Sequence, residues 1–143
     1  MQNNGSPWWL YALLSALFAA LTTIFGKVGV AGVSSNLATA ICTIVIVVLA
    51  WGIVFLTGEN TGLAKLSHKT LVFLVLSGVA TGLSWLCYFR ALQLGPASLV
   101  APIDKSSLVL ILILSVLFLG EPVTWRAVLG GLLIVAGTLV LIR

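Results

Sequence analysis

Long apolar runs are the feature that most limits how this chain can fold. A helix that spans a bilayer needs about 20 mostly apolar residues, with a lower limit near 17. Five runs exceed that limit and show no period-two alternation, which transmembrane β-strands would have. They cover residues 8–26, 37–56, 70–89, 97–119 and 125–142. The sequence therefore predicts an all-α integral membrane protein with five transmembrane helices, in one domain over residues 1–143.

The composition excludes most other classes of protein. Apolar residues make up 61% of the chain and charged residues only 7%, whereas about 25% is usual in soluble domains. Such a chain cannot cover a soluble globule with polar groups, and it is too hydrophobic to be disordered. Its net charge of +4 comes from scattered cations, so no basic patch for nucleic acid is expected. The lipid bilayer is its predicted surrounding.

No enzyme, metal or cofactor chemistry is expected from the sequence. His68 is the single histidine, and no acidic cluster offers metal-ligand spacing. No serine-nucleophile motif is present either. Cys42 and Cys87 both lie inside apolar runs, where thiols usually behave as small hydrophobic groups.

The charges that flank the runs give no clear orientation. Cytoplasmic loops are normally enriched in Lys and Arg. With five spans, three of these residues fall on each side. One side holds Lys65, Lys69 and Arg126, and the other holds Lys27, Arg90 and Arg143. Two interpretations stay open: a balance produced by chance in a small sample, or a chain that inserts in both orientations.

Three sequence blocks in the second part of the chain carry a specific pattern. They read YFRALQLGPASLVAPIDKSS, LSVLFLGEP and LGGLLIVAGTLVL, within residues 88–143. In this order and spacing they closely resemble the EamA-type half of the drug/metabolite transporter superfamily, whereas the first 87 residues match more loosely. Many members of that family carry two five-helix halves of opposite orientation, and this chain looks like one half.

The resemblance implies how the chain functions and assembles. A single half needs a second chain, because transporters with inverted repeats bind substrate where the repeats meet. An identical partner would insert upside-down, which gives an antiparallel ten-helix homodimer in the cell (inner) membrane. The predicted activity is alternating-access transport of small organic solutes, metabolite-like or drug-like and amphipathic or zwitterionic. The alternative is an accessory or lipid-handling subunit that acts with a different partner chain.

The fifth run contains candidate dimer-contact residues. Gly130 and Gly137 are separated by about two helical turns and share a face, with Gly131 beside them. This pattern is similar to the glycine motif in the last helix of small multidrug resistance proteins, which forms their dimer contact. Small residues let helices approach closely in lipid. Packing within one chain is the alternative. The carboxylate that those proteins carry in the first span is absent here.

The third run carries a polar stripe that is a candidate substrate surface. Ser77, Thr81, Ser84 and Tyr88 are spaced four, three and four residues apart, which places them on one helix face. Trp85 lies beside them. The hydroxyls would either line a solute path or bond back to carbonyls of their own helix, as Ser and Thr often do in spans.

The fourth run contains an adjacent charged pair, Asp104 and Lys105, shortly after Pro102. A charge at the bilayer centre costs at least about 2.5–3.5 kcal/mol, so each needs a partner or water. Ser107 shares the Asp104 face of a continuous helix. Either Lys105 extends to the nearer interface, or the pair contacts substrate. The family resemblance favours the second interpretation, because it places the fourth helix of each half at the central cavity.

Overall fold

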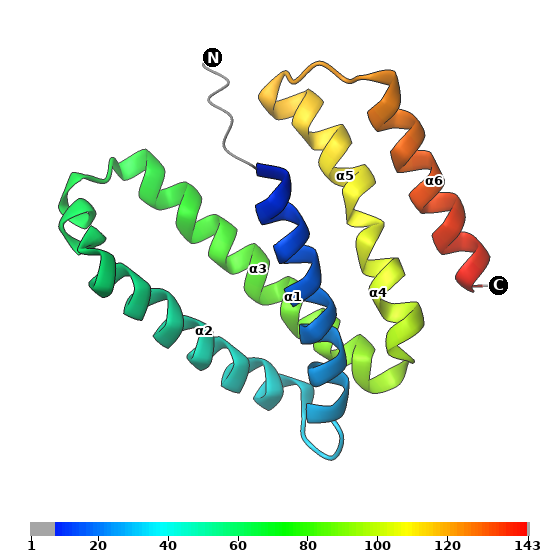
Figure 1. Cartoon of the computed structure of the whole chain (residues 1–143), viewed down its shortest axis with the longest axis horizontal. Helices are drawn as coiled ribbons and strands as arrows, with labels where there is room; N and C mark the ends of the chain where they lie inside the picture. Colours follow the sequence, from blue (N-terminus) through cyan, green and yellow to red (C-terminus); the bar gives the residue numbers. More distant parts are fainter. Residues whose placement is uncertain (1–7, 143) are drawn as a thin grey trace. The chain divides into compact units, whose positions relative to one another are not determined.

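The computed structural model describes residues 8–142, which form helices joined by short connections (Figure 1). No strand occurs in that part of the chain, so the all-α prediction is confirmed. The elements fall into two compact units, and the boundary between them in the chain lies between Leu94 and Gly95. The first unit contains α1 (Trp8–Gly29), α2 (Ser35–Thr57), the 3₁₀-helix η1 (Glu59–Lys65) and α3 (His68–Leu94). The second contains α4 (Ala97–Lys105), α5 (Ser107–Leu114), the π-helix η2 (Ser115–Leu119) and α6 (Trp125–Ile142).

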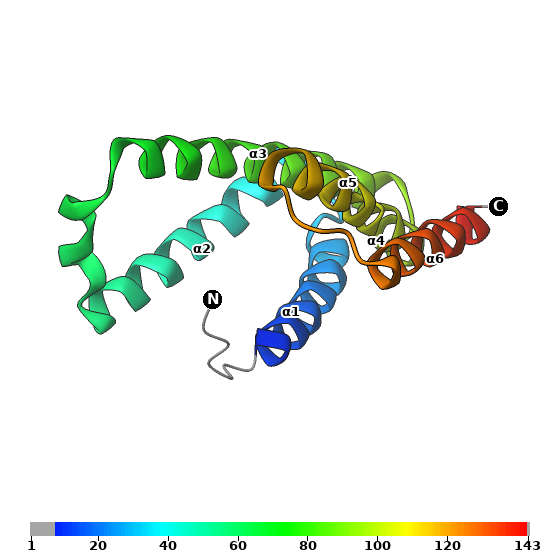
Figure 2. The same ribbon diagram turned by 90° about the horizontal axis from the view of Figure 1, so that it is seen from above.

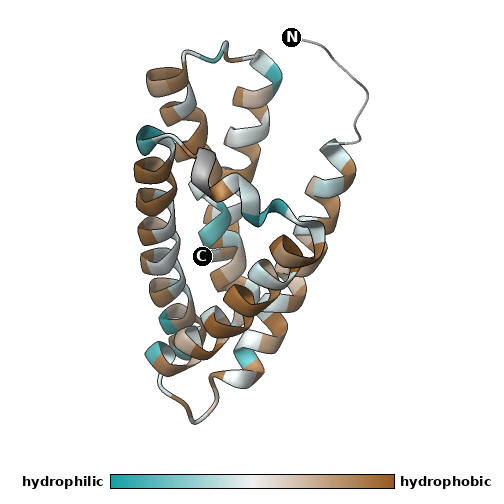
Figure 3. Cartoon of the chain, turned by 90° about the vertical axis from the view of Figure 1, so that its left-hand side faces the viewer, coloured by the Kyte–Doolittle hydropathy of each residue, from teal (hydrophilic) through white to brown (hydrophobic). Residues whose placement is uncertain are grey.

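Four helical stretches are long and apolar enough to cross a membrane: α1, α2, α3 and the stretch Ala97–Leu119. The apolar part of α6, Trp125–Leu141, is shorter than 18 residues and about 26 Å long at 1.5 Å per residue. The structure therefore supports a multi-pass membrane protein but does not confirm five spans. Figure 3 shows hydrophobic colouring over most of the helix length, with hydrophilic residues mainly near helix ends and connections.

Several helices extend beyond the predicted runs. Helix α3 has 27 residues and ends at Leu94, whereas the apolar run was predicted to end at residue 89. Hydropathy measures only the lipid-compatible part of a helix, and α3 continues through Arg90 until Gly95 and Pro96. A residue that precedes proline is disfavoured in α-helical geometry. Helix α1 likewise continues to Gly29 rather than ending at residue 26.

In the first unit, α1 and α3 run in the same direction and pack near their C-terminal ends. Gly26 permits this approach, because a Cβ there would lie 3.3 Å from Cε1 of Phe89. Phe89 and Leu92 are 2% and 0% exposed and form the centre of this packing. The loop after α1 leads back into α2, and the two helices diverge away from that loop (Figure 2). The first unit is therefore tightly packed at the end that carries this loop.

Side chains also satisfy backbone carbonyls at that end. The Lys27 ammonium donates to the Leu92 carbonyl near the end of α3, a position where cations are favoured by the exposed carbonyls of a helix. The Gln93 amide donates to the Val33 carbonyl in the loop, and Arg90 donates to the Gln93 oxygen at 3.1 Å. The Lys27 and Gln93 bonds connect α3 to the end of α1 and to the loop that follows it, while the Arg90 bond lies within α3.

The second unit corrects the prediction of one continuous helix over residues 97–119. The α-helix ends at Lys105 and a new one begins at Ser107. The Ser106 N–H bonds to the Ile103 carbonyl at 3.0 Å, a three-residue step instead of the four-residue step to Pro102. The last turns are π-helical. Proline, adjacent serines and π-bulges are recognised causes of helix kinks, and all three occur within this stretch.

Candidate functional site

The charged pair lies at the helix break. Asp104 is in the last turn of α4 and Lys105 is its final residue. The Lys105 Nζ and Asp104 Oδ2 atoms are 3.5 Å apart, and the side chains are 56% and 38% exposed, respectively. This is a long, partly exposed contact, as expected for neighbours that point about 100° apart on a helix. The pair can thus contact a further group without losing a short, buried ion pair.

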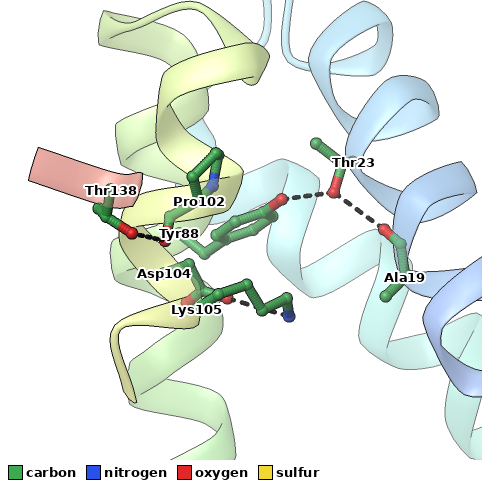
Figure 4. A network of polar contacts seen from close by, with 7 residues as sticks. All are labelled: Ala19, Thr23, Tyr88, Pro102, Asp104, Lys105 and Thr138. Atoms are coloured by element: carbon green, nitrogen blue, oxygen red, sulfur yellow. Dashed lines mark hydrogen bonds and ion pairs between the residues drawn. The ribbon is translucent and has the colours of Figure 1, made fainter. Parts of the chain in front are cut away.

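Backbone groups at the break are also unusual. Pro102 has no N–H to donate to the carbonyl four residues earlier. Its own carbonyl accepts a hydrogen bond from the Thr138 hydroxyl of α6 at 3.3 Å (Figure 4). The same hydroxyl is 2.8 Å from the Ile134 carbonyl, so the two carbonyls share its one proton, and Thr138 is only 6% exposed. A side chain from α6 therefore partly replaces the backbone bond that the break removes.

Sequence reasoning missed Thr138 as part of this site. Its only signal was a hydroxyl directly after Gly137 in an otherwise apolar run, and that signal does not identify its partner. Ser107 begins α5 after the break. Its predicted place on the Asp104 face assumed an uninterrupted helix, so that argument no longer applies to Ser107.

The polar stripe lies on α3 as predicted. Ser77, Thr81 and Ser84 are exposed, while Trp85 and Tyr88 are half-buried. The Thr81 hydroxyl donates to the Ser77 carbonyl at 2.8 Å, which is the back-bonding alternative for that residue. At the other end, the Trp85 ring lies 5.8 Å from the Phe89 ring between centroids. A substrate role for the stripe stays a prediction.

The last residue of the stripe has a partner on another helix. The Tyr88 phenol oxygen is 2.6 Å from the Thr23 hydroxyl of α1. Thr23 also donates to the Ala19 carbonyl at 2.9 Å, so three oxygens form a chain (Figure 4). Sequence reasoning did not identify Thr23 as a site residue. The polar residues Thr23 and Lys27, one turn apart on an apolar helix, were the available signal.

The three glycines of α6 have different surroundings. A Cβ at Gly131 would lie 3.1 Å from Cδ1 of Leu112, so this glycine packs within the chain against α5. A Cβ at Gly130 or Gly137 would meet nothing within 4 Å. That the glycines of α6 contact a second chain stays a prediction, and Gly130 and Gly137 are the two whose surface the chain itself leaves uncovered.

Residues 8–142 contain no group of three or more His, Cys, Asp or Glu side chains that could hold a metal ion. The chemistry that the described side chains offer is therefore limited to charge, hydrogen bonding and aromatic contact. Such groups can bind and orient a solute.

Comparison with known proteins identifies relatives over nearly the whole chain. Residues 6–143 match the EamA-like transporter family. A curated relative from Sinorhizobium sp., described as an "Uncharacterized transporter in cobO 3'region", is 52% identical over 134 residues. The aligned part covers 94% of this chain and 95% of the relative. No solved structure matches.

Proposed function

Because the chain belongs to the EamA-like transporter family, we propose that it is a membrane transporter for small amphipathic or zwitterionic organic solutes. It works by alternating access as an antiparallel homodimer in the cell (inner) membrane. In this proposal α6 forms the fifth span of each chain, since its length is near the lower limit of about 17 residues.

The broken fourth span is the observation that carries the proposal. Proline is tolerated within a span where neighbouring protein or water satisfies the backbone groups that it frees. Ionisable groups within spans generally mark solute or ion paths. This chain has both features together, since Pro102 lies inside α4, and Asp104 and Lys105 are the last two residues of that helix. A transport path next to this break would supply the water or solute groups that both side chains need.

The charge of the pair supports a zwitterionic or amphipathic solute. Asp104 and Lys105 carry opposite charges and are held only by a 3.5 Å contact. Each can therefore face the oppositely charged group of a zwitterion, with Lys105 contacting an anionic group. The apolar residues around the break suit the hydrophobic part of such a solute, and they disfavour bare inorganic ions.

The size of the unit supports assembly from two chains. The Sinorhizobium relative is matched over 95% of its length, so it also has the size of one half. Dual insertion needs a small charge bias, which the balanced tally provides. In that tally, Arg143 and the side chain of Lys65 lie outside the described residues. The counted residues are Lys65, Lys69 and Arg126 on one side and Lys27, Arg90 and Arg143 on the other.

The orientation can be tested with two C-terminal reporters, one active only in the cytoplasm and one active only outside it. We expect signal from both in the native chain. Two lysines added to the loop between α1 and α2 should give a single orientation, and two glutamines added there are the matched control. Signal from only one reporter in the native chain would contradict dual insertion and favour a parallel or heteromeric assembly.

Transport can be tested with the purified chain alone in proteoliposomes. The test compares phenylalanine, as a zwitterionic amphipathic solute, with phosphate as a small anion and with empty liposomes as the baseline. Uptake of phenylalanine above the baseline is expected. A purified chain that neither dimerises nor moves either solute would favour an accessory or lipid-handling role with another partner.

A further inference from the structure

We infer that Thr23 is a positioning residue: its oxygen accepts the only proton of the Tyr88 phenol, so the phenol oxygen can offer a ligand only its lone pairs. This end of the polar stripe then selects solutes that carry an N–H or O–H donor and discriminates against quaternary ammonium groups. The inference rests on the proposed transport function and deepens it by naming the hydrogen-bond polarity of one binding group.

The argument begins with a count of protons. A threonine hydroxyl has one proton to donate and two lone pairs to accept with. The Thr23 oxygen is 2.9 Å from the Ala19 carbonyl oxygen, and a carbonyl can only accept. The Thr23 proton is therefore used in this bond, and only the lone pairs of Thr23 remain for Tyr88.

The second bond then has a defined direction. The Thr23 and Tyr88 oxygens are 2.6 Å apart, within the range of about 2.5–3.0 Å for O–H···O hydrogen bonds. Because Thr23 has no second proton, the Tyr88 phenol must be the donor. The phenol has only one proton, so its oxygen can offer a further ligand nothing except lone pairs.

The surroundings hold the phenol in this position. One helical turn further along, Lys27 donates to the Leu92 carbonyl. A second hydrogen bond therefore joins α1 to α3, again between residues 65 positions apart, as Thr23 and Tyr88 are. The Phe89 ring meets the Tyr88 ring edge-on at 88°, with centroids 6.3 Å apart. A group whose orientation is fixed before binding discriminates better than one that must be ordered by the ligand.

In this inference the lone pairs of the Tyr88 oxygen accept from the ligand. Tyr88 is half-buried, and within residues 8–142 no hydrogen bond other than the one with Thr23 reaches its oxygen. The nearby Trp85 ring can attract any organic cation, including quaternary ones. Discrimination between ammonium groups therefore depends on the phenol, which accepts from N–H but gains nothing from N–CH₃.

The adjacent threonine provides a matched control. Thr22 bonds back to the Phe18 carbonyl at 2.9 Å, as Thr23 does to Ala19. Within residues 8–142 Thr22 makes no hydrogen bond with Tyr88, and it lies on a neighbouring part of the helix surface. Thr22→Val thus removes the same hydroxyl and the same type of backbone bond without changing the phenol.

The direction of the hydrogen bond can be measured directly. The chain has two tyrosines, so Tyr11→Phe leaves Tyr88 as the only one. In resonance Raman spectra the relative intensity of the tyrosine doublet distinguishes a donating phenol from an accepting one. We expect a donor signature in the Tyr11→Phe protein, its loss on adding Thr23→Val, and its retention with Thr22→Val or Thr23→Ser. An acceptor signature before any change at Thr23 would overturn the inference.

Selectivity is tested by equilibrium binding of phenylalanine and its N-trimethyl betaine to the purified chain. The two solutes carry the same charges, but only phenylalanine has N–H donors. One hydrogen bond predicts a preference of roughly 3- to 10-fold for phenylalanine. The preference should disappear in Tyr88→Phe. It should shrink in Thr23→Val, where the freed phenol can donate to the betaine carboxylate. Thr23→Ser should restore it, and Thr22→Val should leave it unchanged.

The outcomes separate this inference from the proposed function. Equal binding of the two solutes by the native chain would overturn the inference while leaving transport of zwitterions intact. If neither solute binds, an N–H donor is not the ligand of Tyr88, and the inference is also wrong. Uptake of other solutes by the same preparation, measured in proteoliposomes, then decides whether the proposed transport function survives.

Discussion

The two units of the chain have similar apolar composition but treat their polar groups differently. In the first, three unbroken helices of 22, 23 and 27 residues place their interhelical polar bonds near one end, around the buried Phe89 and Leu92. In the second, a span of the same length is divided at Ser106, and charged side chains lie at the division. One proline and two adjacent serines therefore change a regular span into one with polar groups inside its length.

This difference indicates different roles for the two units. Backbone irregularity and ionisable groups within a membrane are retained where neighbouring protein or water satisfies them. The second unit has both and uses Thr138 to satisfy one carbonyl. The first unit has a continuous helical framework. We expect substitutions in the second unit to alter transport and those in the first to alter packing, except at Tyr88 and Thr23.

The largest expected effect concerns the charged pair. Asp104→Asn or Lys105→Met alone leaves one charge within the span without its opposite neighbour, so we expect each to lower both the melting temperature and the uptake. The double variant should recover most of that stability but lose transport. Melting curves and uptake, measured on the same preparations, check both expectations. A double variant with normal uptake would show that neither charge acts on the solute.

Close packing in the first unit should be sensitive to volume at Gly26. A leucine there would collide with Phe89 and Leu92, since even a Cβ lies 3.3 and 3.4 Å from their ring and methyl carbons. We expect a loss of about 1–3 kcal/mol, as for other overpacked sites. Gly29→Leu is the control, because a Cβ at Gly29 meets nothing within 4 Å. Equal thermal stability of the two variants would contradict this packing.

The glycines of α6 separate packing within the chain from contact between chains. Gly137→Leu should raise the Kd of the dimer in detergent about tenfold, which corresponds to about 1.4 kcal/mol. The melting temperature of the monomer should not change. Gly131→Leu should instead lower the stability of the monomer, because of the contact with Leu112 at 3.1 Å. Unchanged dimerisation of Gly137→Leu would remove the evidence for this face as the dimer contact.

The smallest effect is expected at Thr138. Thr138→Val removes the proton that the Pro102 and Ile134 carbonyls share, and such bonds contribute about 0.6 kcal/mol on average within membranes. Amide hydrogen exchange near Ile103 and Ser106 should increase while the melting temperature changes little. Thr57→Val in the first unit is the control, since Thr57 bonds only within its own helix. Equal exchange in the two variants would show that Thr138 does not support the break.

Particular residues show what the sequence could and could not predict. The helical membrane class followed from the apolar runs, because length and hydropathy are properties of each segment alone. Pro102 signalled an irregular fourth helix, but the position of the break depends on which carbonyl Ser106 bonds to, and no periodicity contains that information. A helical wheel placed Tyr88 on a polar face, but it cannot show that Thr23 lies opposite. For Gly131, too, the sequence could not distinguish packing within the chain from contact with a second chain, because that depends on where Leu112 of α5 lies.

The break at Ser106 also changes the electrostatic field of the span. An unbroken helix carries its partial charges, about half an elementary charge each, only at its two ends. Ending α4 at Lys105 and starting α5 at Ser107 adds a negative end and a positive end within the apolar stretch. Lys105 lies at the negative end, where a cation is favoured. Neutralising both Asp104 and Lys105 would therefore still leave one negative and one positive helix end at this position.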